Sequence, residues 1–235
     1  MAAGSGSRLG HDLPKAFVPL VDRPLLRHAL DQVFSCPDID NVVLVAPSAH
    51  LSEAQALLLG DEVDRVVVVP GGAERTQSVL QGLSAVGEET AFVLVHDAAR
   101  CLAPASLFTR VIQALHAGRS AVIPGVPVVD TVKQVDDEGL VTGTPERSVL
   151  RAIQTPQGFA REVLADAHRR AVESGQMATD DAALVESCGV PVAVVPGDPA
   201  AAKITTPDDL AFFEYRLTMA NGRDLGLGHD PRSCS

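Results

Sequence analysis

The hydrophobic positions of this chain follow two patterns that alternate along its length. Continuous apolar and β-branched runs occur at residues 42–46, 66–69, 92–95, 121–123 and 190–195. Between them, apolar residues recur every three or four positions, as in residues 25–34. A short continuous run is typical of a strand buried on both faces, and the wider spacing is typical of an amphipathic helix. The alternation predicts an α/β fold in which helices cover a parallel sheet.

The helices are expected at residues 25–34, 51–59, 74–83, 107–116, 161–173, 180–188 and 210–219. Gly175 and Gly189 follow two of them and suit C-terminal caps. The run Thr206-Pro207-Asp208-Asp209 predicts the start of the last helix, because it combines a capping threonine, a proline and first-turn acids. No linker divides the chain, so we expect one domain over residues 1–219. Glycine, charge and serine replace apolar residues afterwards, which predicts a disordered tail at 220–235.

Residues 128–150 follow a different pattern from the core strands. Apolar and polar residues alternate there on both sides of the acidic turn Asp136-Asp137-Glu138-Gly139. This pattern predicts a β-hairpin arm. A two-stranded ribbon is marginal alone, so it needs a surface to pack on. A second copy of the chain is one candidate, and a lid lying on its own domain is the alternative.

The charge and composition limit the partners. Nineteen basic and thirty acidic residues give a formal charge of -11. That sign disfavours nonspecific binding to nucleic acid or to an anionic membrane. The apolar runs are too short to span a membrane and the N-terminus lacks a secretory pattern, so we expect a cytoplasmic protein. Four cysteines without a CxxC pair indicate buried or incidental thiols.

The N-terminus carries the first candidate site. Its sequence Ala2-Ala3-Gly4-Ser5-Gly6-Ser7-Arg8-Leu9-Gly10 is followed by Pro14-Lys15. Glycines let backbone N–H groups approach a ligand closely, and the two cations suit phosphates. Leu9 stands where a dinucleotide-binding loop needs its third glycine, so a nucleoside triphosphate fits better. A plain N-terminal turn remains open as the alternative.

A second candidate site follows the apolar run at 92–95, with the sequence His96-Asp97-Ala98-Ala99-Arg100. Ligands of open α/β sheets bind at the carboxyl ends of strands, so Asp97 suits a metal or ligand role. Its alternative role is a helix N-cap. Pro104 places the next helix start near residues 103–105, which leaves the carboxylate available. No HExxH or GxSxG motif is present, and covalent catalysis is not supported.

Seven motifs in order resemble the 2-C-methyl-D-erythritol 4-phosphate cytidylyltransferase family, over residues 2–219. They are the loop from Ala2 to Arg8 with Pro14-Lys15, Gly71-Gly72 with Arg75 and Ser78-Val79, Val95 to Arg100, Asp130-Thr131 with Lys133, Thr155-Pro156-Gln157 with Phe159, Thr179-Asp180-Asp181, and Lys203-Ile204-Thr205. The resemblance implies a three-layer, Rossmann-like nucleotidyltransferase fold with a mostly parallel sheet and a protruding hairpin arm. It also implies magnesium-dependent transfer of CMP from CTP to the polyol phosphate, with release of pyrophosphate, in isoprenoid biosynthesis.

The resemblance assigns the site residues as follows. The nucleotide would be bound by Ala2, Ala3, Gly4, Gly6, Arg8, Lys15, Gly72, Ser78, Asp97 and Ala98. The polyol phosphate would be bound by Arg100, Asp130, Thr131, Arg147, Thr179 and Lys203. Asp97 would hold Mg²⁺, and the catalytic cations would be Arg8, Lys15, Arg147 and Lys203. A homodimer is implied, in which the arm brings Asp130, Thr131 and Arg147 to the neighbour's site.

The chain departs from the family pattern at three places. Only Met1 precedes Ala2 where the family has a short strand, so either the start lies upstream or the sheet lacks its first strand. Cys101 replaces a proline, and Ala201-Ala202 replace Asn-Ile. For single residues an ordinary alternative stays open, in which Arg75 and Arg147 are surface residues and Thr179 is only a helix cap.

Two alternatives to this function remain. One is a sister cytidylyltransferase for another polyol phosphate such as ribitol 5-phosphate, although Ala2-Ala3-Gly4 favours the erythritol enzyme. The other is a non-catalytic nucleotide-binding homologue. The four charged residues Arg8, Lys15, Asp97 and Lys203 favour an enzyme over this second alternative.

Overall fold

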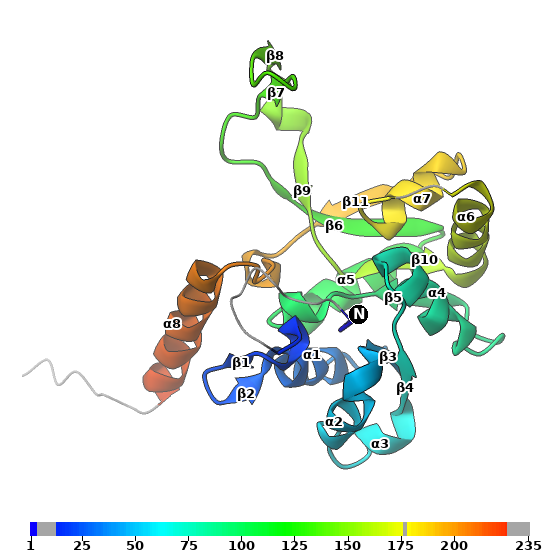
Figure 1. Cartoon of the computed structure of the whole chain (residues 1–235), viewed down its shortest axis with the longest axis vertical. Helices are drawn as coiled ribbons and strands as arrows, with labels where there is room; N and C mark the ends of the chain where they lie inside the picture. Colours follow the sequence, from blue (N-terminus) through cyan, green and yellow to red (C-terminus); the bar gives the residue numbers. More distant parts are fainter. Residues whose placement is uncertain (4–12, 176–177, 225–235) are drawn as a thin grey trace, which may run out of the picture.

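The computed structural model describes residues 1–3, 13–175 and 178–224, with side chains described up to Met219. Its strands are β1 Pro19–Leu20, β2 Arg23–Pro24, β3 Val42–Ala46, β4 Val66–Pro70, β5 Phe92–Val95, β6 Ala121–Pro127, β7 Gln134–Val135, β8 Val141–Gly143, β9 Arg151–Ile153, β10 Gln157–Ala160 and β11 Ala193–Pro196. Its helices are α1 Leu25–Phe34, α2 Leu51–Ala56, α3 Glu62–Arg65, α4 Arg75–Ser84, α5 Ala105–His116, α6 Arg161–Ser174, α7 Asp181–Ser187 and α8 Pro207–Asp224. These elements form the body and the projecting arm of Figure 1.

The main sheet is mixed rather than mostly parallel. Its strand order is β11-β6-β10-β5, with β9 paired to β6, and β3 and β4 form a separate parallel pair. β11 runs parallel to β6, but β10 runs antiparallel to both β5 and β6. The sequence pattern misses β10 because Phe159 is its one large apolar residue. Gly158 is needed there, since a Cβ would lie 2.5 Å from a methyl carbon of Val111.

The first two residues connect the two groups of strands. Ala2 N–H donates to the Val45 carbonyl at 2.8 Å, which ties residue 2 to β3. On the other side, Ala98 N–H donates to the Met1 carbonyl at 3.0 Å, and the Met1 amino group donates to the His96 carbonyl at 2.6 Å. Residues 1–2 therefore lie between β3 and the segment that follows β5.

Most helix boundaries follow the expected capping residues. α5 begins directly after Pro104, and α6 ends at Gly175, which has a φ of 67°. Two boundaries are wrong. The predicted helix 51–59 ends early, since α2 stops at Ala56, and the separate helix α3 follows Gly60, whose φ is 54°. α8 continues to Asp224, beyond the predicted end at 219, and the rest of the expected tail lies outside the described residues.

The apolar stripes of the helices meet the strands in several buried clusters. Leu25 and Leu26 of α1 pack with Leu44 of β3 and Phe213 of α8, while Phe159 of β10 packs with helices α6 and α7. Among the described cysteines, Cys36, Cys101 and Cys188 are all unpaired thiols, as expected. None of the described helices combines enough length with enough apolar character to cross a membrane.

The segment 128–150 contains the antiparallel pair β7 and β8. At its turn, the Asp136 carboxylate accepts hydrogen bonds from the N–H groups of Glu138 and Leu140, and Gly139 has a φ of 82°. Figure 1 shows this arm standing away from the body. Every residue from 134 to 142 is exposed, so in this chain the arm is not a lid over its own domain.

Candidate functional site

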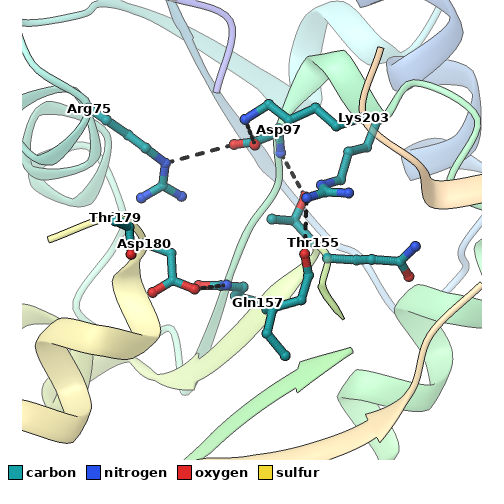
Figure 2. A pocket seen from close by; sticks show the side chains of 10 residues that line it. Arg75, Asp97, Thr155, Gln157, Thr179, Asp180 and Lys203 are labelled. Atoms are coloured by element: carbon teal, nitrogen blue, oxygen red, sulfur yellow. Dashed lines mark hydrogen bonds and ion pairs between the residues drawn. The ribbon is translucent and has the colours of Figure 1, made fainter. Parts of the chain in front are cut away.

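A pocket of about 210 Å³ opens at the carboxyl end of β5. It is lined by Arg75, Asp97, Arg100, Ile153, Gln154, Thr155, Gln157, Thr179, Asp180 and Lys203. Figure 2 shows the labelled members converging from separate loops and helix starts. The antiparallel direction of β10 contributes to this convergence, because Gln157 at its start pairs with Val95 at the end of β5. The pocket therefore lies at the edge of the sheet where ligands of open α/β folds bind.

The Asp97 carboxylate lies between two cations on the pocket wall. Its Oδ2 accepts a hydrogen bond from Lys203 Nζ at 2.8 Å, and its Oδ1 lies 3.8 Å from Arg75 Nε. Burial alone would raise the pKa of Asp97, but Lys203 and Arg75 outweigh burial and hold that pKa well below its usual range. Its side chain caps no helix, as the sequence predicts. Asp97 is therefore an ionised carboxylate facing a ligand pocket.

A buried hydrogen-bond chain fixes the backbone behind this carboxylate. Asp97 N–H donates to Thr155 Oγ1 at 3.0 Å, and Thr155 Oγ1 lies 3.0 Å from His96 Nδ1. The hydroxyl has one proton and two acceptor sites, so it can accept from Asp97 N–H and also bond to His96 Nδ1. Burial lowers the pKa of His96 to about 3. A neutral histidine thus holds Thr155, and Thr155 holds Asp97.

The structure brings four of the predicted ligand-binding residues together in the pocket: Asp97, Arg100, Thr179 and Lys203. Arg100 is fixed by its Nη1 donating to the Ala201 carbonyl at 2.9 Å and its Nη2 donating to the Ile153 carbonyl at 3.1 Å. The expectation that Thr179 caps a helix is wrong. The N-cap of α7 is Asp180, whose carboxylate accepts from the N–H of Ala183 at 3.0 Å.

Several predicted nucleotide-binding groups are already engaged within the chain. The N–H groups of Ala2 and Ala98 donate to the Val45 and Met1 carbonyls, so a ligand would need other atoms of these two residues. Ser78 is buried, and its hydroxyl accepts from Gly72 N–H at 3.0 Å. Ser78 therefore shapes the loop after β4. Ala3 lies against the same loop, where a Cβ on Gly71 would be 2.4 Å from the Ala3 Cβ.

The remaining predicted residues that the structure describes do not line this pocket. Lys15 begins a short 3₁₀ helix. Burial alone would raise the pKa of Asp209, but hydrogen bonds and the nearby charge of Lys15 outweigh burial and lower that pKa. Asp130 and Thr131 are exposed on the arm, and Arg147 Nη1 donates to the Val129 carbonyl at 2.6 Å. Gly4, Gly6 and Arg8 lie outside the described residues.

Sequence reasoning missed several lining residues, of which Arg75 is the most informative. The alternative that Arg75 is an ordinary surface residue is wrong, since the side chain is 30% exposed and pairs with Asp181, which is fully buried. Gln157 was missed as well, and its Nε2 donates to Asp180 Oδ2 at 2.8 Å. Arg75, Gln157 and Asp180 all stand inside motifs that the sequence had already singled out. The motif positions were therefore the available signal.

The donor set suits a magnesium ion that is shared with a ligand. Within the described residues, no group of three or more His, Cys, Asp or Glu side chains could hold a metal alone. Mg²⁺ commonly uses one or two carboxylates together with substrate phosphates and water. Asp97 supplies one ionised carboxylate at the pocket, so the site fits an ion of that kind.

The fold and the site define an α/β protein with a charged ligand pocket at the carboxyl edge of its sheet. The family model described as 2-C-methyl-D-erythritol 4-phosphate cytidylyltransferase matches residues 1–219, and the chain belongs to this enzyme family.

Relatives and solved structures agree with this assignment. A curated protein of the same description from Nocardia farcinica is 52% identical over 216 residues, covering 92% of this chain and 91% of the relative. The crystal structure of 4-diphosphocytidyl-2C-methyl-D-erythritol synthase from Anaerococcus prevotii aligns with a TM-score of 0.80 at 32% identity, covering 92% of this chain and 95% of that chain. The cytidylyltransferase from Thermus thermophilus aligns with a TM-score of 0.75 at 34% identity, covering 92% of this chain and 96% of that chain.

Proposed function

We propose that this protein transfers CMP from CTP to 2-C-methyl-D-erythritol 4-phosphate and releases pyrophosphate, as a step of isoprenoid precursor biosynthesis. The names of its relatives support the two substrates. The observation that carries the proposal is the ion pair between Asp97 and Lys203, which opens into the pocket at the end of β5. A carboxylate and a cation in one pocket suit a reaction between two phosphorylated substrates that share a metal ion.

The reaction needs no nucleophile from the protein. A phosphate oxygen of the polyol phosphate forms a bond to the α-phosphorus of CTP, and the bond from that phosphorus to the bridging oxygen breaks, so pyrophosphate leaves with the electron pair. The contribution of the protein is positioning and the placement of cations where negative charge develops. Lys203 and Arg100 would orient the incoming phosphate from the pocket wall, while Arg8 and Lys15 would stabilise charge on the triphosphate.

The proposed metal ligand is Asp97. Bound Mg²⁺ would neutralise charge on the phosphate oxygens of CTP. The low pKa of Asp97, which Lys203 and Arg75 hold down against the effect of burial, keeps its carboxylate ionised for this role at neutral pH.

The hairpin arm is proposed to complete the site of a second copy of the chain. Asp130, Thr131 and Arg147 lie on or beside the exposed arm rather than in the pocket of their own chain. In a homodimer, the arm would carry them to the partner's site.

The experiment offers CTP with either 2-C-methyl-D-erythritol 4-phosphate or ribitol 5-phosphate, and measures pyrophosphate release with and without magnesium. We expect release with the erythritol phosphate only, and loss of that release when EDTA removes the metal. Release with ribitol 5-phosphate alone would assign the chain to the sister activity. Release with neither substrate, by a protein that still binds CTP, would refute catalysis.

A further inference from the structure

Arg75 reaches the pocket wall from the first turn of α4 and stands beside two acidic side chains. Its Nη2 donates to Asp181 Oδ2 at 2.6 Å, and its Nε lies 3.8 Å from Asp97 Oδ1. Figure 2 shows the guanidinium pointing into the pocket. Among the described residues, Nη1 has no hydrogen-bond partner, so part of the guanidinium fork is open to a ligand.

The direction of this guanidinium is set by a buried pair behind it. Asp181 Oδ1 accepts a hydrogen bond from His168 Nε2 at 2.9 Å, and both side chains are fully buried. Burial alone would raise the pKa of Asp181, but His168 and Arg75 hold that pKa below its usual value. The carboxylate is therefore ionised, and it binds a different donor on each oxygen. With both oxygens occupied, Asp181 cannot rotate without losing a buried hydrogen bond.

The charge on Arg75 is also secure. Burial alone would lower the pKa of Arg75, but Asp181, Asp97 and Asp180 outweigh burial and raise it. The result is a permanent cation whose planar fork is already oriented, so little side-chain freedom is lost when a ligand binds. Phosphate oxygens accept strong charge-assisted hydrogen bonds from a guanidinium, and Nη1 is the part of this one that remains for such a ligand. Lys203 and Arg100 lie on the same pocket and add to its attraction for anions.

We propose that Arg75 binds a phosphate group of one substrate, and that Asp181 and His168 are positioning residues that hold its guanidinium in the pocket. This inference rests on the proposed function, because both substrates of that reaction are phosphorylated. The recognised chemistry is a phosphate monoester or a polyphosphate. The phosphate that Arg75 binds belongs either to CTP or to the polyol phosphate. Measuring the KM of each substrate at saturation of the other shows which of the two it is.

The first set of variants changes the cation. Arg75→Gln removes the charge, and Arg75→Lys keeps the charge but loses the fork. Because Arg75→Gln leaves the buried Asp181 uncompensated, the double variant Arg75→Gln/Asp181→Asn removes both charges and protects folding. We expect the double variant to raise one of the two KM values by about tenfold or more, which is the range for a charge-assisted hydrogen bond. Arg75→Lys should give a smaller rise in the same KM.

The second set tests the positioning role of His168. His168→Gln can still donate an N–H to Asp181, whereas His168→Leu keeps the bulk and removes the donor. We expect His168→Leu to raise the same KM that responds to Arg75, by about threefold or more, and His168→Gln to restore most of the loss. If His168 has only a structural role, His168→Leu will lower the melting temperature and leave both KM values unchanged.

Arg23→Gln is the matched control, because Arg23 also pairs with an aspartate but does not line the pocket. A folded double variant with wild-type KM values for both substrates would overturn the proposal, whatever its kcat. Calorimetric titration of CTP and of the polyol phosphate into each variant gives the same comparison without turnover. The role of Arg75 can therefore be decided even if the proposed reaction fails.

Discussion

The pocket and the hairpin arm hold their predicted functional side chains in different ways. In the pocket, the Asp97 carboxylate is bonded to Lys203, and its backbone N–H is bonded to Thr155. On the arm, the guanidinium of Arg147 contacts one backbone carbonyl of the same arm, and Asp130 is exposed. One chain therefore determines the geometry of its pocket residues, whereas it restrains the arm residues through few contacts of its own.

Burial explains this difference. A buried carboxylate must have partners, because an unpaired buried charge is strongly destabilising, so folding itself selects the geometry around Asp97 and Asp181. An exposed charge is solvated in many orientations and is weakly restrained. The comparison can be tested by changing one region at a time.

The largest effect is expected for Asp97→Asn in the pocket. The substitution keeps the shape of the side chain but removes the charge that pairs with Lys203 and that would bind magnesium. We expect kcat at saturating substrates to fall about 100-fold or more. Asp166→Asn on α6 is the control, because Asp166 is a half-exposed carboxylate that pairs with Arg169 and Arg170 outside the pocket. Full activity of Asp97→Asn at limiting magnesium would contradict the metal assignment.

The next effect concerns the arm and uses two inactive proteins. Lys15→Ala should lower kcat about 100-fold, since a cation that stabilises the transition state contributes on the order of 3 kcal/mol. Arg147→Ala should weaken binding of the polyol phosphate at the partner's site. Mixed dimers then contain one site with neither defect, so an equal mixture should regain up to about a quarter of wild-type activity.

The mixing experiment needs proof that subunits exchange, for which mass spectrometry of differently tagged chains is sufficient. Lys15→Ala mixed with Asp97→Asn is the matched control, because both residues belong to the body of one chain. That mixture should also produce heterodimers, but each of its sites carries a defect. An exchanged Lys15→Ala and Arg147→Ala mixture that stays inactive would place both residues in one chain's site.

A third effect is a pH dependence of stability that arises from His96 beside the pocket. Its pKa falls from 6.5 to about 3 on folding because the ring is buried. Below about pH 6.5, the unfolded chain binds a proton at His96 that the folded chain does not bind, so acid favours unfolding until about pH 3. Between about pH 7 and pH 5, this group should remove about 2 kcal/mol from the free energy of unfolding.

Urea unfolding of wild type and His96→Asn at both pH values measures this contribution. The introduced amide would keep a hydrogen-bonding group near the position of Nδ1 for Thr155, but it does not titrate. The buried His28, whose pKa burial also lowers, remains in both proteins and accounts for part of the acid sensitivity. An unchanged difference between the two pH values in His96→Asn would show that His96 is not the group responsible.

The sequence predicted those parts of the molecule whose structure is set by residues close together in the chain. Pro104 and Gly175 mark helix ends by fixing backbone angles, and both positions are as expected. The alternation around Gly139 predicted a hairpin, and β7 and β8 pair there. β10 could not be found this way. Its residues are buried through tertiary contacts, so neither periodicity nor a continuous apolar run marks the strand.

The sequence predicted which positions belong to the candidate site, but not which of their side chains contact one another. Asp97 and Lys203 were each identified, but their 2.8 Å contact joins residues 106 positions apart in the chain. Arg75 was identified as a motif position without a role, and the surface stayed its default alternative because an arginine without a visible partner is normally exposed. Its partner Asp181 is also 106 positions away, and no local pattern encodes that distance.

The smallest effect on the single chain is expected for two valines near the base of the arm. Val129 and Val149 are 80% and 73% exposed, so changing either one to serine removes little packing from the chain that carries it. The free energy of unfolding of dilute, monomeric protein should change by about 0.5 kcal/mol or less. If the arm packs on a partner, the same change removes apolar contact area there. The dimer dissociation constant should then rise by about tenfold, since burying a valine contributes on the order of 1.5 kcal/mol.

Sedimentation equilibrium measures the dissociation constant, and urea unfolding at low concentration measures the stability of the single chain. Val172→Ser provides the comparison outside the arm, because Val172 on α6 is 60% exposed and lies in the body. Val172→Ser should change the free energy of unfolding and the free energy of dimer dissociation by no more than about 0.5 kcal/mol each. A dissociation constant that responds to Val172→Ser and not to Val129→Ser or Val149→Ser would move the dimer contact from the arm to the body. The arm residues would then have no partner to fix them. The pocket residues would be functional, and the predicted residues of the arm would not.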